Sequence, residues 1–314
     1  MTSVSDSSLW AITTYYNPLE YRSRRENFRV FRDLLPVPLL AVEYSTGSPQ
    51  LEPCDADILV QLRGRDVMWQ KERLYNIARE HLPPECRYVL WLDCDIAFSG
   101  EDWPQRVRDA LESYAFIQPF DRLALLQEGA RPPVQHEAQV LDWRTSLVAL
   151  IAGGVDPRAI YGKWGVSLTM KYAHGIAWAA RREICDQFTF YDRLIVGGGD
   201  KAFTAALFGQ HETLAPTFAF DEPYRSDYLS WAATAHAVAG GSLGFIEATA
   251  CHLWHGAIAL RGYDDRQEKL RDAGFKAMND LGLDPESGCW RWITDKPALH
   301  EHVRNHFIRR QEDG

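Results

Sequence analysis

The stretch between residues 87 and 98, RYVLWLDCDIAF, constrains the fold of this chain more than any other. Its residues 88–92 are apolar without interruption, which is the pattern of a central parallel strand buried on both faces. Asp93 and Asp95 follow at the carboxyl end of this strand, the side on which ligands of open α/β sheets bind. Alternate residues of an extended chain point the same way, and two carboxylates on one side suit Mg²⁺ or Mn²⁺ bridging to phosphates. The stretch therefore predicts a metal and phosphate site at one edge of a sheet.

Asp93 and Asp95 also allow a second interpretation, in which they form an ordinary turn after a strand. Each carboxylate would then accept hydrogen bonds from neighbouring backbone amides. A motif of two aspartates arises by chance after apolar runs, so the rest of the chain must decide between the two interpretations.

The composition is that of a globular protein with a sizeable core, because 46% of the 314 residues are hydrophobic and 12% are aromatic. This length suits one large α/β domain, or one domain with an extension. No stretch approaches the roughly 20 apolar residues of a membrane span. Residues 1–10 show neither the basic nor the apolar region of an export signal. We therefore expect a cytoplasmic protein, for which peripheral membrane association stays open.

Charge and cysteine usage exclude further classes. The net charge of −9 argues against broad binding to nucleic acids. The six cysteines are scattered without a C-x-x-C pair, which is typical of reduced thiols rather than of a disulfide framework or a zinc site.

Strands and helices alternate through the first half of the chain, with short connections between them. This alternation predicts a sheet with a parallel centre and helices on its faces. The expected strands are 10–16, 37–44, 57–62, 88–92 and 115–120, and the expected helices are 20–35, 67–81 and 101–114.

The second half reads as mainly helical, with one apolar extended stretch. The two last helices are charged and form a C-terminal extension. The expected helices are 141–152, 177–184, 201–209, 227–239, 263–274 and 297–310, and the extended stretch is 245–254.

Two further motifs carry chemistry. The sequence GGGD, residues 197–200, places three glycines before an aspartate at the start of a helix, so the backbone can approach a ligand beside the Asp200 carboxylate. The sequence HLWHG, from His252, puts two histidines three residues apart after an apolar strand. An imidazole near a carboxylate pair suits Mn²⁺ as a third ligand, although most histidines are hydrogen-bonded core or surface residues.

The order and separation of these motifs resemble those of inverting glycosyltransferases with the GT-A fold, similar to families 2 and 7, over about residues 10–263. The resemblance implies a Rossmann-like α/β fold, with a mixed sheet flanked by helices. It implies a glycosyltransferase domain over residues 1–262, with a donor half at about 10–120 and an acceptor half at about 121–262. Residues 263–314 are then the helical C-terminal extension.

The resemblance also implies the residues of the donor site. The segment TTYYN contains Thr14 and Asn17, which match a Thr-Tyr-Asn segment that contacts the nucleotide. Glu43 stands where the family carries an aspartate that binds the base, and this departure leaves the base open. Lys71 matches a Lys-x-x-x-x-Asn helix, although a solvated helix lysine is the alternative interpretation. Asp93 is expected at the ribose or at a water on the metal.

The same resemblance implies the metal ligands and the acceptor side. Asp95 is expected to bind Mn²⁺ or Mg²⁺ directly, with His255 as the first and His252 as the second histidine candidate. Asp200 is expected to be the catalytic base, and its alternative role is to cap the following helix. The expected acceptor contacts are Trp164, Gly198 and Gly199.

The sequence therefore predicts a metal-dependent glycosyltransferase that moves a sugar from a nucleotide-diphosphate sugar, expected to be a UDP-sugar, to an acceptor hydroxyl with inversion. A catalytically inactive nucleotide- or sugar-binding module is the alternative from another class. A nucleotidyltransferase is a rival enzyme, but it would carry a glycine-rich basic loop after the first strand, where this chain has TTYYNPLEY. A retaining glycosyltransferase is a further rival. The acceptor stays open between glycan, lipid-linked sugar, protein, metabolite and modified nucleic-acid base.

Overall fold

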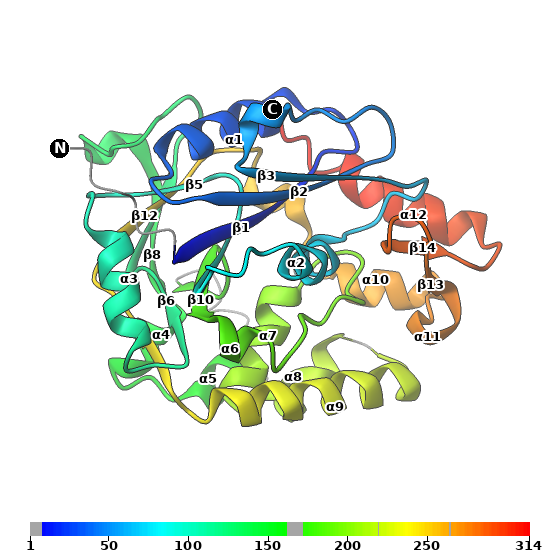
Figure 1. Ribbon diagram of the computed structural model, residues 1–314. Helices are drawn as coiled ribbons and strands as arrows, with labels where there is room; N and C mark the ends of the chain where they lie inside the picture. Colours follow the sequence, from blue (N-terminus) through cyan, green and yellow to red (C-terminus); the bar gives the residue numbers. More distant parts are fainter. Residues whose placement is uncertain (1–7, 162–171, 219, 264) are drawn as a thin grey trace.

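The fold is built on a seven-stranded sheet in a computed structural model that describes residues 8–161, 172–218, 220–263 and 265–314 (Figure 1). The strand order is β11-β6-β10-β4-β1-β2-β3, and β10 runs antiparallel to both of its neighbours. The strands are β1 (Leu9–Tyr16), β2 (Leu39–Ser45), β3 (Ile58–Arg63), β4 (Tyr88–Leu92), β6 (Phe116–Gln118), β10 (Ala177–Arg181) and β11 (Leu243–Phe245).

The parallel centre of this sheet is covered on both faces, as its uninterrupted apolar strands require. Every residue of β2 and of β4 is buried. The helix α1 (Arg22–Leu34) packs Phe28 and Phe31 against one face, whereas α2 (Lys71–Glu80) packs Leu74 and Ile77 against the other. Figure 1 shows α1 and α2 on opposite sides of β1, β2 and β3.

A second sheet of five strands, in the order β5-β12-β7-β8-β9, continues directly from the first. β5 begins one residue after Asp95 and pairs antiparallel with β12, so the two aspartates lie at the junction of the two sheets. The strands are β5 (Ile96–Phe98), β7 (Arg122–Leu126), β8 (Val140–Ser146), β9 (Tyr172–Ala173) and β12 (Thr249–His252).

The described part of the first 262 residues contains seven further helices. Phe203 of α7 lies among the rings of Trp91, Phe116, Trp178 and Phe188, with centroid distances of 5.5 to 5.9 Å. This aromatic cluster fixes α7 against the sheet. The helices are α3 (Trp103–Leu111), α4 (Leu147–Ala152), α5 (Pro157–Tyr161), α6 (Arg182–Cys185), α7 (Gly199–Leu207), α8 (His211–Leu214) and α9 (Glu222–Ala239), with short 3₁₀ turns at Pro53–Asp55, Glu137–Gln139, Ala215–Phe218 and Ile258–Arg261.

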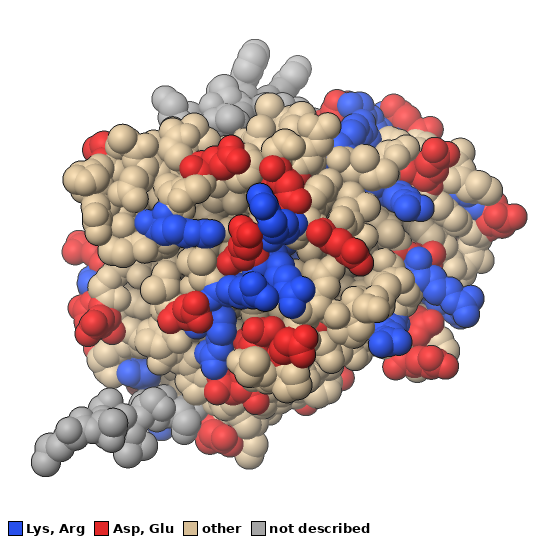
Figure 2. Space-filling model, turned by 90° about the horizontal axis from the view of Figure 1, so that it is seen from above, with Lys and Arg blue, Asp and Glu red and all other residues tan. Residues whose placement is uncertain are grey.

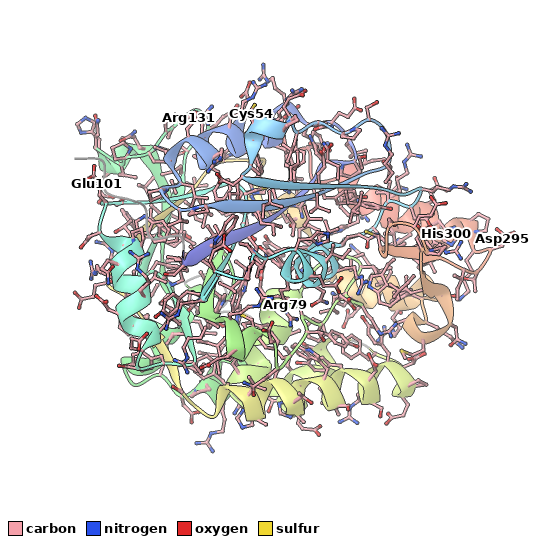
Figure 3. The ribbon with its side chains drawn as sticks, in the orientation of Figure 1. Cys54, Arg79, Glu101, Arg131, Asp295 and His300 are labelled. Atoms are coloured by element: carbon pink, nitrogen blue, oxygen red, sulfur yellow. The ribbon has the colours of Figure 1, made fainter. Side chains whose placement is uncertain are left out.

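The chain after residue 262 packs against the start of α2. The Gln70 side chain donates to Trp290 O and accepts from Trp290 N, and Phe307 contacts the rings of Trp69 and Tyr16. Figure 3 places His300 and Asp295 at the outer edge of this part. Its elements are α10 (Arg266–Asp272), α11 (Ala277–Asp280), β13 (Leu281–Leu283), β14 (Trp290–Trp292) and α12 (Pro297–Ile308). The domain boundary at residue 262 stays a prediction.

The predicted fold class, a mixed α/β sheet flanked by helices, is confirmed. Two predicted helices are wrong in part. Most of 177–184 is strand β10, because its place between β4 and β6 supplies backbone partners that override helix propensity. The first half of 141–152 is strand β8, which pairs with β7 until Ser146 caps α4.

The surface carries charges of both signs, and the cysteines are unpaired. Lys and Arg side chains lie among Asp and Glu side chains on the face seen from above α1 (Figure 2). All six cysteines are free, and five of them are buried, whereas Cys54 is exposed at the upper edge in Figure 3. In the described part of the chain, no helix combines the length and the apolar character needed to cross a membrane.

Truncation of the aromatic cluster should destabilise the whole fold. Phe203→Ala removes a ring that is 6% exposed, and we expect it to lower the free energy of unfolding by about 3–5 kcal/mol. Urea unfolding measures this change. The control Leu34→Ala removes a side chain that is 46% exposed and should change the free energy by less than about 0.5 kcal/mol. Equal effects of the two substitutions would show that the cluster is not part of the core.

Candidate active site

A cavity of about 530 Å³ opens where β1, β4 and β12 end. It lies at the carboxyl ends of parallel strands, where the fold leaves a crevice. Most of the residues singled out in the sequence meet on its wall. They are Thr14, Asn17, Lys71, Asp93, Asp95, Gly198, Asp200, His252 and His255.

The pairing of β5 with β12 brings Asp95 to the two histidines. His252 lies opposite Ile96, and the amide of Leu253 donates to Asp95 O at 2.8 Å. His255 Nε2 lies 3.1 Å from Asp95 Oδ2, and His252 Nε2 lies 3.8 Å from Asp95 Oδ1. In the described part of the chain, these three residues form one group whose ligand atoms all lie within 4.8 Å of one another.

This group has the chemistry of a divalent metal site. Asp95 Oδ1 is buried without a hydrogen-bond partner among the described residues. Burial and the nearby Arg261 lower the pKa of His255 to about 3 and that of His252 well below its usual value, so both rings are neutral and keep a lone pair. Adjacent ligands about 2.1 Å from an octahedral ion lie about 3 Å apart, close to the observed Asp95–His255 spacing. One carboxylate and two imidazoles therefore fit Mn²⁺.

Asp93 stands apart from this group and pairs with Lys71, the first residue of α2. Lys71 Nζ lies 2.5 Å from Asp93 Oδ1 and 3.2 Å from each oxygen of Asp200. Burial raises the pKa of Asp93, and the Lys71 ammonium opposes this shift. The Lys71 side chain is 12% exposed, so it is not a solvated helix lysine. Lys71 therefore connects Asp93, which follows β4, to Asp200 of the GGGD motif.

The Asp200 carboxylate packs directly against the backbone of Gly175. A Cβ on Gly175 would lie 2.2 Å from Asp200 Cγ, so any larger residue there would displace the Asp200 side chain. Gly198 has φ +112° and caps α7, whereas Asp200 lies in the first turn of α7. The helix-cap role considered for Asp200 therefore belongs to Gly198. The Asp200 side chain is 45% exposed on the cavity wall.

Three of the sequence-predicted residues are not on the described cavity wall. Glu43 is 1% exposed and accepts from Gln50 N, Leu51 N and Gln61 Nε2, so its oxygens hold the turn after β2. Contact between Glu43 and a base would require this turn to rearrange. Gly199 packs against Glu72, since a Cβ there would lie 2.0 Å from Glu72 Oε1. Trp164 lies outside the described residues.

Five arginines on the cavity wall were missed in the sequence, namely Arg24, Arg144, Arg261, Arg266 and Arg310. Arg261 Nη2 lies 3.2 Å from His255 Nε2, and Arg266 stacks over the Tyr263 ring at 5.0 Å. Arg144 of β8 has a buried Nη2 without a hydrogen-bond partner among the described residues. Neither Arg261 nor Arg266 pairs with a carboxylate in the described chain. No motif marks Arg144, Arg261 or Arg266 in the sequence. Arg144 falls in the predicted helix 141–152, Arg266 in the predicted charged helix 263–274, and Arg261 in no predicted element.

No protein-family profile matches the chain, and no curated protein sequence matches it. Among solved structures, the chain is similar to S. aureus TarS residues 1–349 in complex with UDP-GlcNAc, with 9% identity and a TM-score of 0.41, over 96% of this chain and 72% of that one. It is also similar to glucosyl-3-phosphoglycerate synthase of Mycobacterium tuberculosis in complex with Mn²⁺, UDP-glucose and phosphoglyceric acid. The identity is 10% and the TM-score 0.42, over 88% of this chain and 83% of that one. At these values the likeness assigns no function to the chain.

Glu72 should give the protein a measurable pH dependence. Burial, partly offset by Lys71, raises the pKa of Glu72 from about 4.5 to about 8. The folded state therefore keeps a proton that the unfolded state has released between these values, so the free energy of unfolding should fall as pH rises through this window. In Glu72→Gln, which has no such proton to lose, this decline should be smaller in urea unfolding without metal.

The matched control is Glu80→Gln, at the exposed end of α2. It should keep the wild-type decline. If Glu72→Gln loses as much stability with rising pH as the wild type does, Glu72 is ionised in the folded protein.

Proposed function

We propose that this chain is a metal-dependent glycosyltransferase that moves a sugar from a nucleotide-diphosphate sugar to an acceptor hydroxyl with inversion. The donor is the UDP-sugar that the sequence resemblance implies. One observation carries the proposal: the Asp95, His252 and His255 group shares one cavity with Asp200, and Lys71 stands between Asp93 and Asp200.

The donor side follows from the charges on the cavity wall. A divalent ion held by Asp95, His252 and His255 would act as a Lewis acid that neutralises the leaving diphosphate. Arg261 and Arg266 line the same cavity and have no carboxylate partner among the described residues, so they add positive charge for the diphosphate. Asp93, which pairs with Lys71 apart from this group, is suited to a ribose hydroxyl or to a water on the metal.

The acceptor side rests on Asp200. Inversion by direct displacement needs a base that takes the proton of the acceptor hydroxyl on the face opposite the leaving group. Asp200 is the partly exposed carboxylate that Lys71 connects to Asp93, and its side chain packs against Gly175. The Lys71 ammonium must then share Asp200 with the acceptor, which positions the carboxylate without burying it.

The products distinguish the proposed function from its two alternatives. An inactive module would bind the donor without turnover, whereas this cavity brings the candidate metal ligands together with the partly exposed carboxylate of Asp200. A nucleotidyltransferase would release pyrophosphate from a nucleoside triphosphate and would not need Asp200. Product analysis separates the three functions.

Nucleotide binding should require both metal and Asp95. We expect one nucleoside diphosphate, UDP first, to raise the melting temperature of the wild type with Mn²⁺ and not without it. Saturation at a hundred times the dissociation constant is worth about 2.7 kcal/mol. Asp95→Ala should abolish the shift, whereas Asp102→Ala, which lies at the exposed start of α3, should keep it. A shift of equal size in Asp95→Ala would remove the metal site from the proposal.

Loss of the Asp200 carboxylate should affect transfer more than donor binding. Asp200→Asn should lower kcat by about 10²- to 10⁴-fold and keep the Mn²⁺-dependent thermal shift with the nucleotide. Release of UDP from the UDP-sugar and acceptor labelling measure kcat. Asp186→Asn, which breaks a surface ion pair with Arg182, serves as the control and should leave kcat unchanged. Unchanged turnover in Asp200→Asn would show that another group is the base.

A further inference from the structure

Residues 309–314, called here the C-terminal segment, pack directly behind the histidines of the cavity. A Cβ on Gly256, the residue after His255, would lie 2.9 Å from both Arg310 O and Gln311 O, and Gly256 has φ +81°. The segment is also tied to α1, because Asp313 accepts from the amides of Arg22 and Ser23 at 3.0 and 2.8 Å. This part of the chain is therefore a fixed wall of the site.

The side chain that the C-terminal segment presents to the site is Glu312, which is 2% exposed. Glu312 Oε1 lies 3.5 Å from His255 Nδ1, and the other ring nitrogen, Nε2, lies 3.1 Å from Asp95 Oδ2. His255 Nδ1 is buried and has no hydrogen-bond partner among the described residues, and the Glu312 carboxylate lies within reach of it. The His255 ring therefore lies between a buried carboxylate and the candidate metal group.

Two guanidinium groups hold the Glu312 carboxylate in place. Arg24 Nη2 donates to Oε1 at 2.9 Å and Arg24 Nε donates to Oε2, so the pair is bidentate. Arg310 Nε donates to Oε1 at 2.6 Å. The carboxylate is therefore held in one orientation, with Oε1 on the side of His255.

We propose that Glu312 is a positioning residue of the metal site, which accepts the Nδ1–H of His255 and so directs the Nε2 lone pair toward the ion. A neutral imidazole carries one proton, so an Nε2 ligand requires the proton on Nδ1. A carboxylate that accepts this proton fixes the tautomer and raises the basicity of the ligand, and its loss typically costs 10- to 100-fold in metal affinity. The inference rests on the metal site of the proposed function.

Titration of the nucleotide-free protein with Mn²⁺ alone, followed by calorimetry, tests this role. Glu312→Ala should weaken Mn²⁺ binding at least about tenfold. The matched control is Asp313→Ala, which removes the neighbouring carboxylate and its bonds to α1 but does not touch His255, and it should bind Mn²⁺ as the wild type does. Equal weakening in both variants, or none in Glu312→Ala, overturns the role of Glu312 and leaves the proposed function standing. A wild type that takes up no Mn²⁺ overturns both.

A second measurement uses the wild type, since Glu312→Ala leaves Arg24 and Arg310 without their partner. Nitrogen-15 spectra of histidine-labelled protein, with Zn²⁺ as the diamagnetic ion, report the tautomer of His255, and the signal is assigned by its absence in His255→Gln. We expect the Nδ1–H tautomer once the ion is bound. A His255 that carries its proton on Nε2 in the presence of the ion overturns the proposal.

Discussion

The antiparallel pairing of β5 with β12 is the interaction on which the candidate site depends. β5 follows the aspartate motif without a break, and β12 ends at His252, so one short ladder sets the distance between Asp95 and both histidines. A register shift of one residue would turn His252 to the other face of the sheet. The distances within the Asp95, His252 and His255 group therefore depend on this backbone pairing as well as on the side chains.

Charge is the second organising feature of the cavity. Burial of carboxylates is costly unless cations compensate. Lys71 pairs with Asp93 and Asp200, whereas Arg24 pairs with Glu312. Burial raises the pKa of Glu72 to about 8 in spite of the nearby Lys71. Asp95 is the buried carboxylate that lies against two neutral histidines, which is the setting that a divalent cation would complete.

Much of the fold was predictable from the sequence, because β1, β2 and β4 are apolar runs that only a covered parallel sheet explains. The wrong helix prediction at 177–184 shows where such local patterns mislead. Its alanine-rich sequence favours a helix, but two neighbouring strands supply backbone partners that a local pattern does not contain. Local sequence predicts an element well where the strand is apolar on both faces. It predicts an element poorly where the hydrogen bonds to distant strands determine the secondary structure.

The residues of the site also fall into two sets, those that a local motif marks and those that only the tertiary packing brings to the cavity. Asp93, Asp95 and Asp200 could be singled out because their motifs combine apolar runs, glycines and carboxylates locally. The link that Lys71 makes between two of them was not readable, since it depends on the packing of α2 against α7. Arg261 and Glu312 were out of reach for the same reason, because nothing near them in the sequence marks a charged residue as part of a cavity.

The pairing of β5 with β12 also has a consequence for how the candidate metal group forms during folding. Asp95 is synthesised long before His252 and His255, and the loop that separates them encloses much of the described chain. Closure of so long a loop is among the slow events of folding. The Asp95, His252 and His255 group is therefore assembled only when distant segments of the chain have met, and no local segment contains all of its ligand atoms.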